Sequence, residues 1–237
     1  MKLSRLITVL MGRRGASASP LLTGLVSHWT MDETTGNRVD SHGTFDLSPQ
    51  NTVGYDTGIL GNCATMVTGA LNRLTRSDAA ILAINFNAFT ITAWVYIPTA
   101  FAADCAIFSK GAEFQFYIES NGINLNVSST AGGTSSADYN VTLNADTWYF
   151  VAARFDMAGD RKAKVKVNDG DWAVAGIALS VGDTVKNSTN YINVNAMGNG
   201  AVGTCRYDSL SFWTRALQDS EIDLLYNEGA GLDYPFP

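Results

Sequence analysis

Apolar and polar residues alternate in several short segments of the chain, and the clearest of these is residues 89–97. Its odd-numbered residues are all apolar, whereas its even-numbered residues are Thr90, Thr92, Trp94 and Tyr96. Because neighbouring side chains of a strand point to opposite faces, this segment predicts a central strand with one aliphatic face. Residues 148–156 are apolar at both parities, which predicts a strand that is covered on both sides.

The middle of the chain predicts a hairpin, a loop and an edge strand. Residues 113–119 alternate, and Asn121-Gly122 supplies the residue types of a tight turn before residues 123–127. Residues 128–139 are rich in Ser, Thr and Gly, which predicts an exposed loop. Residues 162–167 place three lysines on one face, which predicts a solvated face that protects a sheet edge.

The first expected strand covers residues 25–33. Its pattern predicts packing through Trp29 and Met31, with His28 on the opposite, surface face. His42 falls in a following region that is rich in turn residues.

The last expected strand, residues 206–213, places Asp208 on the same face as Leu210 and Phe212. The period then changes, because Ile222, Leu225 and Tyr226 recur at helical spacing with Leu224 beside them, and Gly229 offers a stop. A late strand that leads directly into a short amphipathic helix favours a β-sandwich with a helical lid.

Composition supports short strands joined by polar turns, since 46% of residues are hydrophobic, only 16% are charged, and there are 22 glycines. We therefore predict an all-β fold of two antiparallel sheets with one short C-terminal helix. A single domain is expected over residues 22–237, preceded by a basic N-terminal arm over residues 1–21. No stretch of the sequence is long and apolar enough to span a bilayer.

The charge is unevenly distributed. The net charge is -6, yet residues 1–19 hold no acid and four bases, namely Lys2, Arg5, Arg13 and Arg14. The acidic remainder argues against nucleic acid as the main ligand. The basic segment has two interpretations: a retained arm that tethers the domain to a larger assembly, or a secretion signal that ends at Ala18. Arg13 and Arg14 interrupt its apolar run, which favours the arm.

Cys63, Cys105 and Cys205 lie far apart in sequence and lack the spacing of a metal site. Each lies in or beside an apolar stretch, which favours buried thiols. One disulfide bond with one cysteine left over is the alternative.

Three stretches share their order and spacing with a known family: LVSHWTMDETTG, then FTITAWVYI with the later TWYFVAARFD, and finally YDSLSFWTRALQDSEIDLLYNEG. Over residues 22–230 the chain resembles the laminin-G-like (concanavalin A-like lectin/glucanase) superfamily. The resemblance implies a jelly-roll sandwich whose members mostly bind glycans or proteins, often with calcium. The chain departs from the family pattern at Ser209, where a second acid is usual, and at Gln218, where a Ser-type helix cap is usual.

A calcium site needs several oxygen ligands, and the sequence offers Asp32, Asp40, Asp46 and Asp208. Asp208 in particular needs a partner if it shares a face with apolar residues. A backbone cap would satisfy it equally well, and the missing second acid weakens the calcium interpretation.

Catalysis is not expected. Glucanases of this superfamily carry three alternating acids on one strand, but the best match here is Glu113, Gln115 and Tyr117, in which only the first residue is acidic. Glu113 and Glu119 share a face but lie about 20 Å apart on an extended strand. No nucleophile-elbow pattern accompanies either histidine.

A glycan site needs aromatic faces that stack on sugars and polar groups that bind hydroxyls. The expected candidates are Trp94 and Tyr96 on the central strand and Gln115 and Tyr117 on the hairpin. The alternative is that these aromatic residues are covered and belong to the core.

Together these features predict a non-catalytic binding module. The preferred interpretation is a virion-associated protein, such as a bacteriophage decoration or adhesion protein, attached through its N-terminal arm. The alternative is a secreted or surface-bound bacterial carbohydrate-binding module, with or without calcium. A degenerate glycosidase is a third and weaker interpretation.

Overall fold

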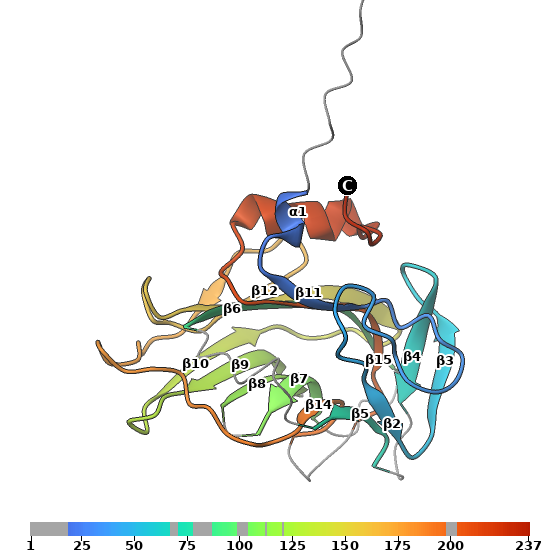
Figure 1. Cartoon of the computed structure of the whole chain (residues 1–237). Coiled ribbons are helices and arrows are strands. Elements are labelled where there is room, and N and C mark those ends of the chain that lie inside the picture. The colour runs from blue at the N-terminus through green and yellow to red at the C-terminus, as the bar shows by residue number, and fades with distance from the viewer. Residues whose placement is uncertain are drawn as a thin grey trace, which may run out of the picture.

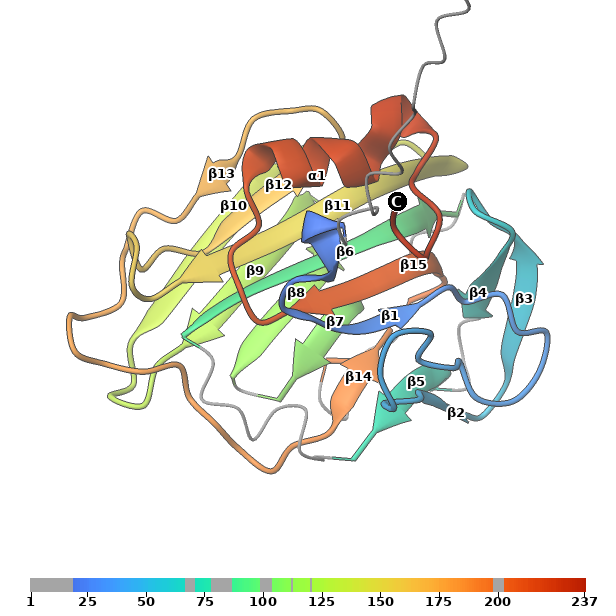
Figure 2. The ribbon, with the colours of Figure 1, turned by 45° about the horizontal axis from the view of Figure 1, so that its top comes forward.

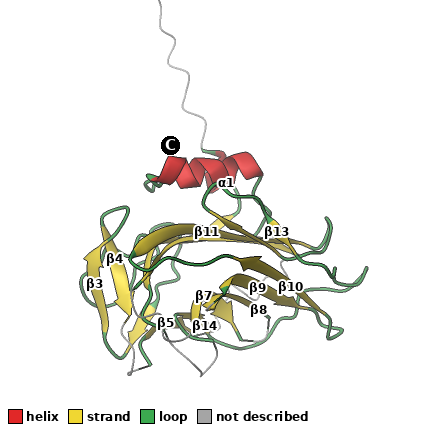
Figure 3. Ribbon diagram, turned by 180° about the vertical axis from the view of Figure 1, so that it is seen from behind, coloured by secondary structure: helices red, strands yellow, loops and turns green. Residues whose placement is uncertain are grey.

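Two antiparallel sheets stack on one another in the computed structural model, which describes residues 19–66, 71–77, 87–98, 104–111, 113–119, 121–197 and 203–237. One short α-helix lies across the outer face of one sheet, and the other sheet forms the opposite layer (Figure 1, Figure 3). The predicted all-β fold, a two-sheet sandwich with one short C-terminal helix, is confirmed.

The eight-stranded sheet has the order β13-β12-β11-β6-β15-β4-β3 within the described residues, and β1 also pairs with β15. Its strands are β1 (Leu25–Trp29), β3 (Val53–Thr57), β4 (Asn62–Met66), β6 (Ala88–Ile97), β11 (Thr147–Asp156), β12 (Lys164–Val167), β13 (Ala173–Val174) and β15 (Arg206–Trp213).

The seven-stranded sheet has the order β10-β9-β8-β7-β14-β5-β2 within the described residues. Its strands are β2 (Ser48–Gln50), β5 (Arg73–Arg76), β7 (Cys105–Lys110), β8 (Phe114–Glu119), β9 (Gly122–Ser128), β10 (Thr134–Asn140) and β14 (Ile192–Val194).

The core between the sheets is built by the predicted alternation. The odd-numbered residues of β6 from Phe89 to Ile97 are all buried there, and β8 contributes its apolar residues from the facing sheet. The ring of Phe114 lies 5.2 Å from that of Phe89 and 6.5 Å from that of Phe212. Burial of each such side chain contributes about 1.5–3 kcal/mol, so this layer fixes the two sheets face to face.

The outer face of the eight-stranded sheet is covered by α1 (Asp219–Tyr226), by the 3-10 helix η1 (Pro20–Leu22) and by residues 230–237 (Figure 2). Trp213 is fully buried beneath them, and its Nε1–H group donates to the carbonyl of Leu21 at 2.8 Å. Pro20 and Leu21 therefore pack with the domain, although the sequence assigned them to the arm. Residues 1–18 of the arm, including Lys2, Arg5, Arg13 and Arg14, lie outside the described residues.

Helix α1 is fixed at both ends by local contacts. At its start, the N–H group of Gln218 donates to Glu221 Oε2 at 2.8 Å, and Arg215 contacts the Glu221 carboxylate at 2.6 Å. The last residue of the helix is Tyr226, and its C-cap is Asn227, which has a left-handed φ of 48°. Asn227 also begins the 3-10 turn η2 (Asn227–Gly229), so the C-cap lies two residues before the predicted stop at Gly229. Leu224, which the sequence pattern adds to the apolar stripe of the helix, is not buried with it, because its side chain is 43% exposed.

A bulge in β15 corrects the expected position of Asp208. Ser209 has a φ of 49°, and the pairing of β15 with β6 shifts register between Asp208 and Ser211. The bulge reverses the parity of the strand, so Asp208 pairs with Trp94 and does not share a face with Leu210 and Phe212. The side chain of Asp208 is therefore directed away from the core between the sheets.

Two further predictions were wrong in part. Residues 134–140, expected in a loop, form strand β10, in which Ser135 and Ala137 are buried. Lys166, expected on a solvated face, is only 8% exposed and pairs with Asp223 of α1 at 2.9 Å. In both cases a neighbouring element covers a strand face whose polar residues predicted exposure to solvent.

Candidate functional site

The outer face of the seven-stranded sheet is lined by amide and hydroxyl side chains. The residues of β8 and β9 that alternate with the core residues are Gln115, Tyr117, Asn124, Asn126 and Ser128, together with the acidic Glu119 at the end of β8. Thr75 of β5 and Asn193 of β14 continue this surface across the sheet. The helices of the described residues all lie on the other sheet (Figure 1, Figure 3). This polar face is therefore the one that α1 leaves uncovered.

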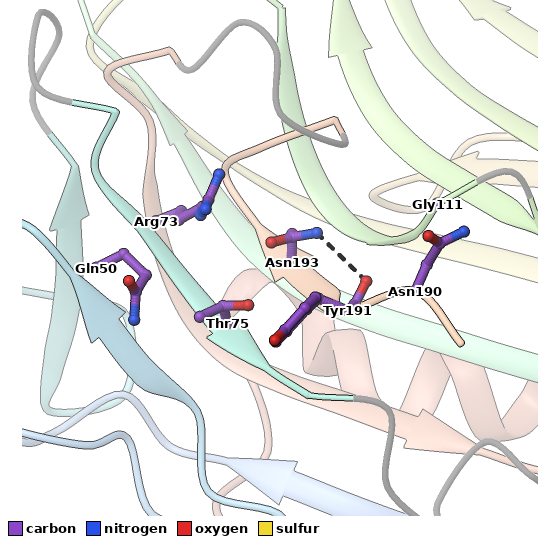
Figure 4. A pocket seen from close by; sticks show the side chains of 7 residues that line it. All are labelled: Gln50, Arg73, Thr75, Gly111, Asn190, Tyr191 and Asn193. Carbon is purple, nitrogen blue, oxygen red and sulfur yellow. Dashed lines mark hydrogen bonds between the residues drawn. The ribbon is translucent and has the colours of Figure 1, made fainter. Parts of the chain in front are cut away.

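A pocket of about 610 Å³ opens on this face where β2, β5 and β14 lie side by side (Figure 4). Strand residues form one side and the segment before β14 forms the other. Its lining residues are Gln50, Arg73, Thr75, Gly111, Asn190, Tyr191 and Asn193.

Tyr191 supplies the aromatic surface of this pocket, and its side chain is 58% exposed. The Nδ2 group of Asn193 donates to the carbonyl of Tyr191 at 3.3 Å, as Figure 4 shows, and the Thr75 hydroxyl donates to the carbonyl of Ile192 at 3.0 Å. These bonds hold the segment in place and leave the phenol ring of Tyr191 exposed to a ligand.

Among the described residues that line the pocket, Arg73 is the one that carries a charge. Its Nε atom is buried, and within the described part of the chain no acceptor bonds it. No carboxylate of the described residues lies within 4.0 Å of its guanidinium group. The pocket is thus locally cationic on a chain with a net charge of -6.

The turn after β7 bounds the pocket and is anchored from below. Gly111 has a φ of 49°, and a Cβ atom there would overlap Asn190, so a side chain at this position would displace a lining residue. Beneath the turn, the ammonium group of Lys110 lies 3.0 Å from the carboxylate of Glu113, and both side chains are almost completely buried.

The same ion pair holds the segment that leads to Tyr191. Lys110 donates to Asn187 Oδ1 at 3.2 Å, and the N–H group of Ser188 donates to Glu113 Oε1. Ser188 in turn accepts a bond from the Asn190 amide at 2.8 Å. A buried charge pair therefore connects the turn after β7 with the segment that carries two lining residues.

A second hollow of about 410 Å³ adjoins the first and shares Gly111 with it. It extends the polar face over β8, β9 and β10. Its other lining residues are Phe114, Gln115, Asn126, Ser128, Thr134 and Met197.

The four residues predicted for a glycan site do not come together. Trp94 is 3% exposed on the outer face of the eight-stranded sheet, where it packs against Phe150 and stacks on Tyr226 of the helical lid. Tyr96 lies on that sheet as well, under the guanidinium of Arg206. Gln115 and Tyr117 belong to the other sheet. The alternative interpretation, that the aromatic residues are covered and belong to the core, describes Trp94 correctly, and the helical lid is what covers it.

The four aspartates predicted for calcium form two separate backbone caps. The carboxylate of Asp40 accepts bonds from the N–H groups of His28, His42, Gly43 and Phe45 at 2.8–3.1 Å, and Asp46 accepts from the N–H group of Asp40 at 3.0 Å. Burial raises the pKa of Asp40, but these bonds outweigh it and the net pKa is lowered. Asp40 and Asp46 thus close one loop.

Asp32 and Asp208 cap a different turn, between β3 and β4. Asp208 Oδ2 accepts bonds from the N–H groups of Ile59 and Leu60 at 2.7 and 2.9 Å, and Asp32 Oδ1 accepts from Asn62 at 2.7 Å. Within the described ranges, no group of three or more acidic, histidine or cysteine side chains is placed to hold a metal. The residues therefore do not fit a calcium site that uses all four aspartates, and the backbone cap offered as its alternative is found instead.

His28 lies in the interior, so its predicted surface position was wrong. The side chain is 1% exposed, stacks on Tyr234 at 4.7 Å, and places Nδ1 2.7 Å from the Ser211 hydroxyl. Burial lowers the pKa of His28 to about 4. His42 lies beside the same tyrosine, with Nδ1 3.0 Å from its hydroxyl. The two histidines thus fix the C-terminal segment.

The sequence did not single out Arg73, Tyr191 or Asn193. A signal was present, because Ile192 and Val194 alternate with Asn193 and Asn195, which is the pattern of a half-buried strand. The segment is only three residues long as a strand, and its partners are distant in sequence.

Known proteins share this fold. The binding domain of Paraclostridial Mosquitocidal Protein 1 superposes with a TM-score of 0.69 at 13% identity, over 88% of this chain and 53% of that chain. Botulinum neurotoxin type C, whose cell entry depends on interaction with two ganglioside molecules, superposes with a TM-score of 0.68 at 12% identity, over 87% and 51%. The binding domain of botulinum neurotoxin DC in complex with SialylT gives 0.68 at 11%, over 87% and 52%.

The chain therefore spans about half the length of these structures, and at such identity the likeness shows the fold. No curated protein matches the chain. In the described part of the chain, no helix combines the length and apolar character needed to cross a membrane. A family model matches residues 72–223, which is more than half of the sequence. On this match, the chain belongs to the concanavalin A-like lectin/glucanases superfamily, in its Laminin_G_3 family.

Proposed function

We propose that this protein is a non-catalytic, glycan-binding domain that holds its sugar on the outer face of the seven-stranded sheet. The observation that carries the proposal is the pocket of about 610 Å³ in which an exposed tyrosine lies beside amide, hydroxyl and guanidinium groups. Sugars present apolar C–H faces and many hydroxyls, so this mixture of one aromatic ring and several hydrogen-bonding groups suits them.

Each kind of lining residue has a role in this proposal. The ring of Tyr191 stacks on a sugar face, while Gln50, Thr75 and Asn193 bind its hydroxyls. Arg73 offers a forked set of donors that matches a carboxylate. Because none of the described residues that line the pocket carries a carboxylate, we propose that an acidic sugar binds there more tightly than its neutral counterpart.

The absence of hydrolysis is part of the same proposal. Glycoside hydrolysis needs a pair of carboxyl groups about 5–9.5 Å apart across the scissile bond. The described lining residues contain no acid, and Glu113, the best sequence candidate, is 1% exposed and faces Lys110. Assays on laminarin-like polymers are expected to show no release of sugar.

The related folds support a binding role without defining it. Structures of similar fold come from toxins for which ganglioside or SialylT binding is described, and these chains are about twice as long as this one. The carbohydrate-binding interpretation therefore has more support than virion attachment. Attachment through residues 1–21 stays a prediction, and intact-mass analysis for Met1 separates a retained arm from cleavage after Ala18.

Substitution of Tyr191 by Ala is expected to weaken sugar binding about fivefold, because a stacking contact contributes on the order of 1 kcal/mol. A glycan array followed by calorimetry on the best ligand measures this loss. Trp94→Phe is the matched aromatic control, since Trp94 lies on the opposite sheet under the lid, and it is expected to leave affinity unchanged.

The Arg73→Gln variant tests which class of sugar binds, separately from where the sugar binds. The variant is expected to bind acidic glycans more weakly while it binds neutral glycans as wild type does. Most of the salt dependence of acidic-glycan binding should also be lost. The proposed site is wrong if Tyr191→Ala binds as wild type does, or if Trp94→Phe weakens binding while remaining folded. Loss of neutral and acidic glycans alike in Arg73→Gln would keep the site and reject the acidic preference.

A further inference from the structure

Cys105 and Cys205 place their sulfur atoms against each other across the core. Cys105 is the first residue of β7 in the seven-stranded sheet, and Cys205 directly precedes β15 in the eight-stranded sheet. Their Sγ atoms are 2.7 Å apart, and both side chains are fully buried. This separation exceeds a disulfide bond by only about 0.7 Å. Two residues that are far apart in sequence are thus positioned as a thiol pair.

The third cysteine does not compete for either partner. Cys63 lies in β4, is fully buried, and directs its thiol to the carbonyl of Thr57 in the adjacent strand β3 at 3.6 Å. Burial raises the pKa of its thiol to about 11, so it is a poor nucleophile at neutral pH. Of the three pairings that three cysteines allow, the geometry supports one.

We propose that Cys105 and Cys205 form a disulfide bond that joins the two sheets. In the reaction one cysteine, as thiolate, attacks a disulfide of an oxidoreductase or of a small thiol compound and expels one thiolate. The other cysteine then attacks this mixed disulfide and expels the second. Two protons and two electrons leave the protein thiols, and the external disulfide is reduced to two thiols.

The local environment suits this exchange. The Cys205 thiol donates to Cys105 Sγ, and this bond lowers the pKa of the Cys105 thiol although burial opposes it. Cys105 is therefore the more readily ionised of the two thiols while the pair is in place. Because both sulfur atoms are inaccessible in the folded chain, the exchange takes place before the sheets close or during transient opening.

The bond would close a loop that contains the pocket turn and β14. The two cysteines lie 100 residues apart, and Gly111, Tyr191 and Asn193 lie between them. Closure of so long a loop restricts the unfolded chain and raises Tm by on the order of 10 °C. Such a bond persists only where thiols are oxidised, so its presence would place the chain in an oxidising compartment.

The test is disulfide mapping of the full chain. Reduced, denatured protein is refolded in a buffer of reduced and oxidised glutathione, alkylated under denaturing conditions without reductant, and digested for mass spectrometry. We expect one linked peptide pair that contains Cys105 and Cys205, with Cys63 alkylated. The linked form should melt on the order of 10 °C above the C105S/C205S variant. Addition of a thiol reductant to the folded protein before melting should abolish that difference.

Cys63→Ser is the control, and it should retain the linked peptide and the same response to reductant. Alkylation of all three cysteines after refolding in oxidised glutathione would overturn the proposal, as would a link that includes Cys63. Because mapping reads the bond directly, a variant that folds poorly does not obscure the result.

Discussion

Replacement of Glu113 by Gln is expected to lower the free energy of unfolding by about 3–5 kcal/mol, because it removes the carboxylate that faces the buried ammonium group of Lys110. A charge that loses its partner in the interior keeps its desolvation cost and loses the attraction that offset it. Urea denaturation measures the change as a lower midpoint with an unchanged slope.

Two matched variants separate burial from charge. The surface pair Lys164–Asp160 is partly exposed, so Asp160→Asn should cost less than about 1 kcal/mol. The apolar double variant Lys110→Met/Glu113→Leu should recover much of the loss, because it removes both charges. Its sugar affinity should nevertheless stay reduced, since the hydrogen bond that the Ser188 N–H group donates to Glu113, which holds the segment before Tyr191, is gone. A cost below about 1 kcal/mol for Glu113→Gln would show that the pair is solvated.

Asp208 is expected to make the protein less stable as pH rises. Burial raises the pKa of Asp208 to about 7 from its ordinary value of 3.8. A raised folded-state pKa means that the stabilisation is complete below pH 3.8 and is lost as pH rises through about 7. The loss between these limits is about 4 kcal/mol. Oδ1 of Asp208 is buried and has no hydrogen-bond partner among the described residues, which agrees with an environment that disfavours the charge.

Asp208→Asn isolates this contribution, because an amide keeps an acceptor for the N–H groups of Ile59 and Leu60 without the titration. The difference in unfolding free energy between wild type and variant is measured from pH 4 to pH 8. It should shift by several kcal/mol in favour of the variant as pH rises. A flat difference for Asp208→Asn would contradict the assignment.

His28 produces the opposite slope. Its pKa is lowered to about 4 by burial, so the stability it contributes is complete above its ordinary pKa of 6.5 and is lost as pH falls through about 4. The size of this loss is about 3 kcal/mol. The two groups therefore partly cancel in the wild type, and the difference curve of His28→Gln should have the reverse sign to that of Asp208→Asn.

The sequence predicts the layers of this fold better than the surfaces they present. Phe89 to Ile97 alternate without interruption, so their burial followed directly from strand geometry. The bulge at Ser209 has no comparable signal in the sequence. A single left-handed residue reverses the parity of the strand after it, so Asp208, which precedes the bulge, lies on the face opposite to Leu210 and Phe212. Strand β10 was missed because its inward residues include Ser135, which is buried through a bond to the carbonyl of Ile177.

Parity also leaves open which sheet a strand joins. Trp94 and Tyr117 both alternate with core residues, so both were expected on one binding face, yet they lie on opposite sides of the sandwich. Which side remains open depends on α1, whose packing over Trp94 is set by contacts far apart in sequence. The pocket likewise depends on β2, β5 and β14, short strands that meet only in the folded chain.

The binding face is tested most directly by amide chemical-shift mapping with the best ligand from the glycan array. The proposal predicts that the perturbed amides cluster on the outer face of the seven-stranded sheet, around Thr75, Tyr191 and Asn193. Amides around Trp94 beneath the helical lid should not move. Perturbations confined to the eight-stranded sheet or to the edges of the sandwich would contradict it.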